Sequence, residues 1–216
     1  MTHLRFIVAA LLCVTLAATA TAAEKIRVAC VGDSITFGAG VEDREKNNYP
    51  KKLGELLGDD YTVNNYGNSG ATLLKKGDKP YWTLGEFKDA TEFAPNIVVI
   101  KLGTNDTKPQ NWKHAAEFAA DLQAMVEHFQ KLPSKPTVYI CKPVPVYETK
   151  WGINEKDLTT GVIPHGEAVA KETGAGMIDL YAALTGHPEM FPDKIHPNAA
   201  GAAVIAKTVA TAIAKK

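Results

Sequence analysis

Short apolar runs alternate with stretches of helical periodicity along most of this 216-residue chain. Runs rich in β-branched and other apolar residues predict five strands, at 26–31, 61–66, 96–103, 137–143 and 176–181. Apolar residues recur at helical spacing in 49–57, 111–132, 153–173 and the Ala-rich tail 198–215, with Gly161 and Pro164 interrupting the third segment. Strands separated by helices indicate an α/β fold, in which helices cover both faces of a parallel sheet.

The first 23 residues have the layout of a secretory signal peptide. Arg5 is followed by an apolar stretch from Phe6 to about Leu16, and then by a run of Ala and Thr. An N-terminal anchor is the less favoured alternative, because a membrane span needs about 20 apolar residues. We therefore expect a signal peptide at 1–23, one domain at 24–216, and a secreted or periplasmic protein without stable membrane insertion.

Composition narrows the classes of partner. The chain has 24 basic and 24 acidic residues, and they are interspersed without a basic stripe, so nucleic acid is not an expected partner. After residue 23 only Cys30 and Cys141 remain, too few for a disulfide scaffold. The sequence contains no H-E-x-x-H motif and no cysteine cluster, so neither a metal nor another cofactor is expected.

The first candidate for chemistry is the turn GDSITFGAG, residues 32–40, directly after the first predicted strand. Ligands of open parallel sheets bind at the carboxyl ends of the strands, which is where Ser34 lies. Of the other serines, Ser134 lies in a turn expected at the opposite end of the sheet. Ser34 is therefore the predicted nucleophile, with Asp33 bracing its loop.

A serine hydroxyl needs an oriented base, and FPDKIHPNAAG, residues 191–201, offers one. Asp193 lies three residues before His196, close enough in one turn of chain to hold the imidazole in the right tautomer. Helix capping is the alternative role for this pair. His114 and His128 are interpreted as surface residues of the 111–132 helix. His165 follows a proline in the interrupted helical segment, and His187 lies in the loop TGHPEMF.

Two loops can donate hydrogen bonds to a developing oxyanion. Gly70 in NYGNSGATL lets a backbone N–H approach a ligand closely, and Asn105 in KLGTNDT offers a side-chain amide. The N–H of Ser34 is the third candidate donor. Each loop alone is also typical of an ordinary turn. Asp106 is expected to brace its loop, or else to cap the helix that follows.

Taken together, GDSI (32–35), NSG (68–70), GTND (103–106) and DKIHPN (193–198) resemble the four sequence blocks of the SGNH/GDSL hydrolase family. The resemblance implies a flavodoxin-like, three-layer α/β/α fold with a five-stranded parallel sheet in the order 2-1-3-4-5. It implies Ser34 as nucleophile, His196 as base supported by Asp193, and Ser34, Gly70 and Asn105 as oxyanion donors. In that order a strand separates Cys30 from Cys141, so the two should not form a disulfide. The α/β-hydrolase elbow has the motif G-x-S-x-G, and Thr36 stands at the position of its last glycine, so the sequence does not match that motif.

These features predict a serine carboxylic-ester hydrolase that works through an acyl-enzyme, on a small-molecule or polysaccharide ester. Expected export and four aromatic residues in loops at the catalytic face favour removal of acetyl groups from carbohydrate. These residues are Trp82, Trp112, Tyr147 and Trp151. The stretches 32–40 and 65–74 further resemble exported family members related to sialate and xylan acetylesterases. The alternatives are a broad-specificity thioesterase or lysophospholipase of the same family, and a non-catalytic module that binds an anion or a sugar.

Overall fold

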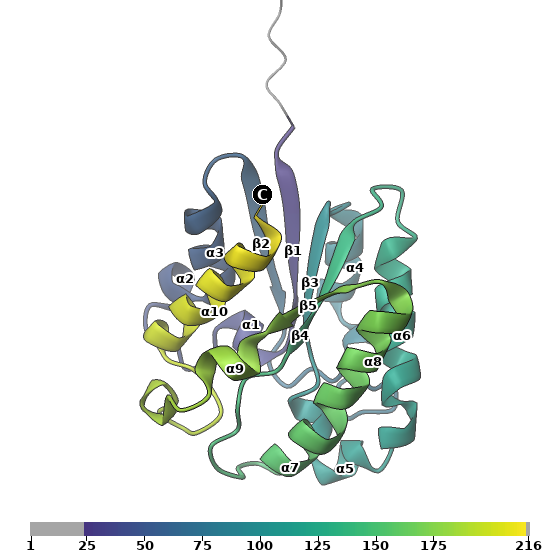
Figure 1. Cartoon of the computed structure of the whole chain (residues 1–216), viewed down its shortest axis with the longest axis vertical. Coiled ribbons are helices and arrows are strands. Elements are labelled where there is room, and N and C mark those ends of the chain that lie inside the picture. The colour runs from purple at the N-terminus through teal and green to yellow at the C-terminus, as the bar shows by residue number, and fades with distance from the viewer. Residues whose placement is uncertain (1–23, 215–216) are drawn as a thin grey trace, which may run out of the picture.

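The computed structural model describes residues 24–214 and contains a five-stranded parallel sheet in the order β2-β1-β3-β4-β5 (Figure 1). This confirms the predicted α/β class and strand order. The signal peptide predicted for residues 1–23 lies outside the described residues. Each strand boundary lies within two residues of its prediction: β1 Ile26–Gly32, β2 Tyr61–Gly67, β3 Ile97–Lys101, β4 Thr137–Lys142 and β5 Gly176–Asp179.

Helices cover both faces of the sheet, with α3 and α10 on one side and α4, α6 and α8 on the other (Figure 1). The α-helices are α1 Ser34–Phe37, α2 Arg44–Asn47, α3 Tyr49–Leu57, α4 Gly85–Glu92, α5 Pro109–Trp112, α6 Phe118–Gln130, α7 Glu155–Asp157, α8 Ile163–Thr173, α9 Leu180–Leu184 and α10 Ala199–Ile213. Four single 3₁₀ turns and a π-helical segment complete the secondary structure: Tyr81–Thr83, Asn105–Thr107, Ala115–Glu117, Pro188–Met190 and Leu158–Val162. Among residues 24–214, no helix combines the length and the apolar character that crossing a membrane requires.

Alternation along the strands divides the core in two. Successive residues of β1 point to opposite faces. Val28 and Cys30 therefore pack with Leu53 of α3 and Ile205 of α10, whereas Ala29 and Val31 belong to the core on the side of α6 and α8. Both faces of the central strands are buried, which explains why β1 and β3 are almost entirely apolar.

The two long helical segments differ from their predictions. The segment 111–132 is not one helix, since α5 ends at Trp112 and α6 begins at Phe118. The segment 153–173 is less interrupted than predicted, because α7, the π-helical turns and α8 follow one another without a break from Glu155 to Thr173. Pro164 is the second residue of α8 and directly follows the π-helical turns, so it does not break the segment. Gly161 lies within the π-helical turns, where a Cβ would come 2.2 Å from the Trp112 ring.

The carboxyl end of β5 also differs from its prediction. Residues 180–181, assigned to the strand from their apolar character, begin α9 instead. Asp179 ends the strand because its carboxylate accepts a hydrogen bond of 2.8 Å from the N–H of Ala182 and so caps that helix.

The cysteines are placed as the strand order requires. Cys30 on β1 and Cys141 on β4 are buried free thiols on the same face of the sheet, and β3 with Val99 lies between their strands. Burial raises the pKa of the Cys30 thiol to about 12, although a hydrogen bond with Tyr49 acts in the opposite direction. Both thiols are therefore protonated and unreactive in the folded protein.

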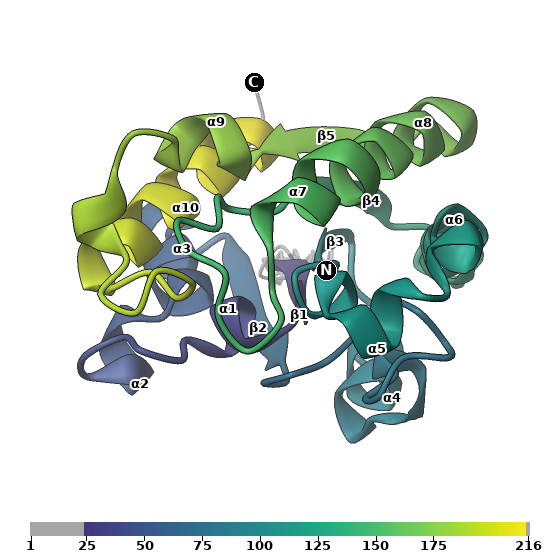
Figure 2. The same cartoon turned by 90° about the horizontal axis from the view of Figure 1, so that it is seen from below.

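All five strands point the same way, so the loops that follow them gather at one end of the sheet. Figure 2 views this end, with α1 close to its centre. Close backbone packing brings the first two loops together: a Cβ on Gly67, the last residue of β2, would lie 2.1 Å from the backbone nitrogen of Phe37. Only glycine at 67 lets the turn that carries Ser34 sit directly against the end of β2.

Candidate active site

Ser34 opens a single helical turn immediately after β1. Asp33 caps this turn by accepting a hydrogen bond of 3.0 Å from the N–H of Ile35, as its expected bracing role requires. Gly38 ends the turn in the left-handed region, at φ 94°. The short α1 therefore fixes the backbone on both sides of Ser34, a residue that is 8% exposed at the end of the sheet.

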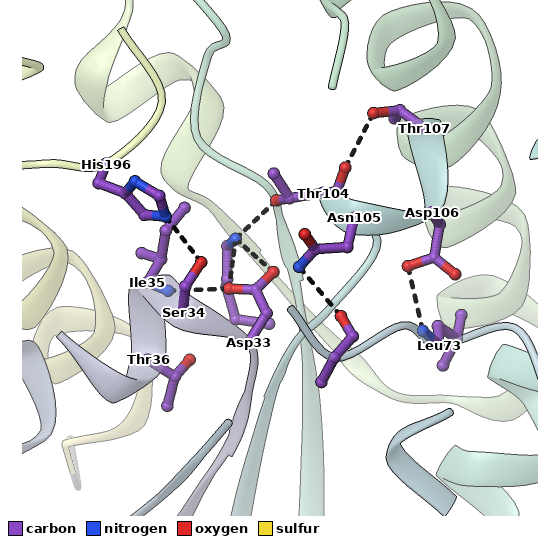
Figure 3. Close-up of polar contacts among 12 residues, drawn as sticks. Asp33, Ser34, Ile35, Thr36, Leu73, Thr104, Asn105, Asp106, Thr107 and His196 are labelled. Atoms are coloured by element: carbon purple, nitrogen blue, oxygen red, sulfur yellow. Dashed lines mark hydrogen bonds and ion pairs between the residues drawn. The ribbon is translucent and has the colours of Figure 1, made fainter. Parts of the chain in front are cut away.

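His196 approaches Ser34 from the last loop of the chain. Its Nε2 lies 2.9 Å from Ser34 Oγ, and its Nδ1 lies 2.7 Å from Asp193 Oδ2 (Figure 3 shows the bond to Ser34). The other oxygen of Asp193 accepts the N–H groups of Ile195 at 2.9 Å and His196 at 2.7 Å. This carboxylate fixes both the backbone turn and the ring of His196.

The same loop shows which residue caps α10. The cap of α10 is Asn198, whose side chain accepts the N–H of Gly201 at 3.1 Å. Asp193 is therefore not needed for capping. Partial burial alone would raise the pKa of Asp193, but the N–H and ring of His196 and the N–H of Ile195 outweigh burial and lower it. The carboxyl stays ionised at neutral pH, as support for an imidazolium requires.

The three predicted oxyanion donors surround the space beside Ser34 Oγ. Within residues 24–214, the N–H groups of Ser34 and Gly70 have no protein acceptor. Gly70 has φ 85°, a conformation that favours glycine. The Asn105 amide donates one N–H to Ala71 O at 3.1 Å, which leaves its second N–H free (Figure 3). These donors lie with Ser34 and His196 around one pocket of about 220 Å³.

Residues 30–204 match the model of the GDSL-like lipase/acylhydrolase family, which is most of the chain. The chain belongs to this family. It is also 41% identical over 208 residues to an acetylxylan esterase of Xylanibacter ruminicola, an alignment that covers 88% of this chain and 43% of that protein. The chain thus spans less than half the length of this curated relative.

Solved structures agree with the fold of this GDSL-like domain. Est24, a carbohydrate acetylesterase from Sinorhizobium meliloti, superposes with a TM-score of 0.73 at 20% identity, covering 88% of this chain and 99% of Est24. The acetyl xylan esterase AlAXEase superposes with a TM-score of 0.70 at 23% identity, covering 87% of this chain and all of that one. At these identities the likeness concerns the fold alone.

In this GDSL-like domain Asp106 braces the loop that follows β2 and does not cap α5. Its two oxygens accept the N–H groups of Leu73 at 3.0 Å and Leu74 at 2.8 Å. Complete burial raises the pKa of Asp106 to about 7, since the N–H donors of Leu74 and Leu73 compensate only in part. A buried carboxylate therefore replaces the ladder hydrogen bonds that an irregular loop lacks.

Lys101 is the residue near the site that sequence reasoning missed. It ends β3, its side chain is fully buried, and its Nζ lies 3.0 Å from Asp33 Oδ2. The available signal was a lysine inside the β-branched run NIVVIKLG, in a strand expected to be buried on both faces. A charge in that position requires a buried partner.

Of the four predicted substrate-binding aromatics, the structure brings only Trp151 to the pocket. Trp82 packs against Phe87 and donates to Leu73 O at 2.9 Å. Trp112 packs against Phe118, and Tyr147 packs against Phe191. These three rings close the core beneath the loops.

Trp151 stands at the tip of a tight turn next to His196. Lys150 and Ile153 form the backbone hydrogen bonds of this turn, and its two central residues, Trp151 and Gly152, have φ 54° and 83°. Trp151 is 58% exposed as a residue, and the centroid of its ring lies 5.8 Å from that of His196. A bulky residue in the left-handed region costs of order 1–3 kcal/mol, so the surrounding turn holds this ring at the pocket against strain.

Among residues 24–214, no histidine other than His196 forms a hydrogen bond with Ser34. His128, interpreted as a surface residue, is half-buried on α6, where its Nε2 lies 2.9 Å from Thr91 Oγ1 and its ring packs on Phe87. His187 pairs with Glu189 on the surface. The described part of the chain contains no group of three or more His, Cys, Asp or Glu side chains arranged to hold a metal ion.

Substitution of Asp106 tests the electrostatic cost of its burial. In the unfolded chain its carboxyl ionises near pH 3.8, whereas in the folded protein its pKa is about 7. Between these values folding disfavours the ionised form, so this group makes the protein less stable as pH rises. Asp106→Asn removes the effect. The stability of the variant relative to wild type should therefore rise between pH 4 and 7, by up to about 1.4 kcal/mol per pH unit, and stay constant above that range.

Urea unfolding of both proteins at a series of pH values measures this difference. Asp78→Asn is a matched control, because the pKa of this surface carboxyl is lowered and its stability difference should not rise over that range. A constant difference between Asp106→Asn and wild type from pH 4 to 7 would show that Asp106 is already ionised throughout.

Proposed function

We propose that this domain is a serine esterase that removes acetyl groups from carbohydrate through an acyl-enzyme. The observation that carries the proposal is the continuous set of contacts from Asp193 through His196 to Ser34, 2.7 Å and 2.9 Å long. Gly70 and Asn105, which supply the other predicted N–H donors, line the same pocket as Ser34 and His196. Family membership and 41% identity to an acetylxylan esterase support the same chemistry.

In the first half of the proposed reaction Ser34 becomes acetylated. His196 Nε2 takes the proton of Ser34 Oγ as this oxygen attacks the ester carbonyl carbon. The carbonyl oxygen becomes negatively charged and accepts hydrogen bonds from Ser34 N, Gly70 N and the Asn105 amide. His196 then gives its proton to the leaving alcohol, and the acetyl group stays on Ser34.

Hydrolysis of the acetyl-enzyme repeats these steps with water. His196 takes a proton from water as the water oxygen attacks the acetyl carbon, and returns that proton to Ser34 Oγ as acetate leaves. Asp193 stays ionised and stabilises the imidazolium in both halves, consistent with its lowered pKa.

Pocket shape favours a short acyl group over the thioesterase or lysophospholipase alternative. The pocket holds about 220 Å³, and its apolar side chains come from three residues. A long acyl chain needs an apolar groove beside Ser34, whereas the wall offers only Ala39, Trp151 and Ile153 as apolar contacts. We also propose that the protein is exported to the periplasm or beyond, on the basis of the signal-peptide layout of residues 1–23.

Replacement of the nucleophile tests the reaction type. Ser34→Ala should lower kcat for p-nitrophenyl acetate by at least about 10³-fold and abolish labelling by a fluorophosphonate probe, while the thermal midpoint changes little because the hydroxyl lies at a loop. His196→Ala should be comparably severe, and Asp193→Asn milder. Ser69→Ala, which alters the other serine of the pocket wall, is the matched control and should keep both activity and labelling. Labelling of Ser34→Ala would contradict the assignment, and absence of labelling in wild type would favour a binding module.

Acyl-chain length tests the substrate class. With p-nitrophenyl acetate, butyrate, octanoate and palmitate, kcat/KM should fall steeply beyond butyrate, because the small pocket leaves a longer chain in water. A rise of kcat/KM with chain length would overturn acetyl specificity and favour the lysophospholipase alternative.

The exposed Trp151 ring is the proposed contact for a sugar. Trp151→Ala should raise KM for acetylated xylo-oligosaccharides roughly three- to tenfold through lost stacking. It should leave kcat/KM for p-nitrophenyl acetate within about twofold, since that ester has no sugar. Leu56→Ala on α3 is the matched control, because Leu56 is similarly exposed, at 57%, and lies outside the pocket. Equal losses on both substrates would mean that Trp151 acts through His196 and not on a sugar.

A further inference from the structure

Lys101 uses all its hydrogen-bonding capacity inside the protein. Its Nζ donates to Asp33 Oδ1 at 3.1 Å, to Asp33 Oδ2 at 3.0 Å and to Thr104 Oγ1 at 2.7 Å. An ammonium group has three N–H donors, so none is left for another partner. Neither Lys101 nor Asp33 is exposed to solvent, so these contacts and the N–H of Ile35 on Asp33 replace water around the two charges.

The partners of Lys101 are the immediate neighbours of the two key polar side chains of the site. Asp33 precedes Ser34 and caps the turn that carries it. Thr104 precedes Asn105, whose amide is the proposed side-chain donor to the oxyanion. The Lys101 ammonium therefore links two loops (Figure 3). It binds Asp33 in the turn that carries the nucleophile, and Thr104 next to the proposed oxyanion donor.

Stability alone gives little reason for this arrangement. Two charges removed from water lose several kcal/mol of solvation each, and an apolar pair of similar volume is commonly at least as stable. The neighbouring strand positions Val98, Val99 and Ile100 are apolar and fully packed, so the fold accommodates apolar side chains there. An apolar pair would make no directional contact, whereas the hydrogen bonds of Lys101 fix the position of one loop relative to the other.

We infer that Lys101 is a positioning residue that holds the nucleophile turn and the oxyanion loop in register. The inference rests on the proposed function. Through Thr104, Lys101 sets the distance from the Asn105 amide to the carbonyl that Ser34 attacks. A misplacement of such a donor by about 1 Å can cost up to about 10²-fold in rate.

The sharpest test removes one hydrogen bond and leaves the ion pair intact. Thr104→Val has nearly the same shape but no hydroxyl, so it should lower kcat for p-nitrophenyl acetate about tenfold or more with KM changed less than twofold. Thr104→Ser keeps the hydroxyl and should recover most of the lost kcat. Thr91→Val is the matched control: it removes a hydroxyl that bonds His128 and Phe87 O on α4, away from the site, and should leave kcat unchanged.

A double-mutant cycle tests whether Thr104 acts through Lys101. Lys101→Met combined with Asp33→Asn leaves no unpaired buried charge, and Asn can still cap Ile35. In this background kcat should already be lowered, and adding Thr104→Val should change it less than twofold. Equal losses from Thr104→Val in both backgrounds would overturn the inference. If the Lys101→Met, Asp33→Asn protein does not fold, the Val, Ser and control variants still decide it.

The same measurements separate this inference from the proposed function. If Ser34→Ala retains activity, the esterase assignment fails. If Ser34 is required but Thr104→Val behaves like Thr91→Val, or lowers kcat without rescue by Thr104→Ser, the esterase assignment stands and the positioning role of Lys101 is wrong.

Discussion

The hydrogen bond between Ser34 Oγ and His196 Nε2 joins residues 162 positions apart in the chain. No local motif sets that distance. It depends on the position of β1 in the sheet and on the packing of α10, whose Ile205, Ala206 and Val209 are buried against the same face as Val28 and Cys30. Because packed interiors resist small displacements, the core determines the 2.9 Å between the two side chains. The apolar interior is therefore as much a part of the site as the polar groups above it.

Between this core and the pocket lies a layer of buried charge. Asp33, Lys101 and Asp106 are all without solvent exposure, and each binds a loop segment that follows a strand. Loops at the end of a parallel sheet have no neighbour strand to satisfy their N–H groups. Here the carboxylates of Asp33 and Asp106 accept those N–H groups. Their burial costs solvation free energy, but their directional hydrogen bonds fix the loops in place. Because burial raises the pKa of Asp106 to about 7, this carboxyl exchanges a proton near neutral pH, and protonation lowers the cost of keeping it buried.

Much of the fold follows from local sequence, because β-branched runs and helical spacing reflect burial on two faces or one. The helix 49–57 and all five strands were predictable on that basis, and the candidate site residues followed from their chemistry and their places after strands. The strand order came from resemblance to a family, which also implied the same roles for the site residues. The errors have a common cause. Whether Trp82 faces substrate or core, and whether Gly161 breaks a helix, depends on residues far away in the chain. Lys101 was overlooked for the same reason, since its partner Asp33 is 68 residues distant.

Gly161 and Gly67 differ in whether a second substitution could make room for a larger residue. At Gly161 the obstacle to a larger residue is the side chain of Trp112, which a second substitution could shrink, so these two positions are free to covary. At Gly67 the obstacle is the backbone of Thr36 and Phe37, which every amino acid shares. No compensating mutation elsewhere can make room there without moving the turn that carries Ser34. Descendants of this sequence can therefore exchange Gly161 together with its partner, whereas Gly67 can change only at the expense of the geometry around Ser34.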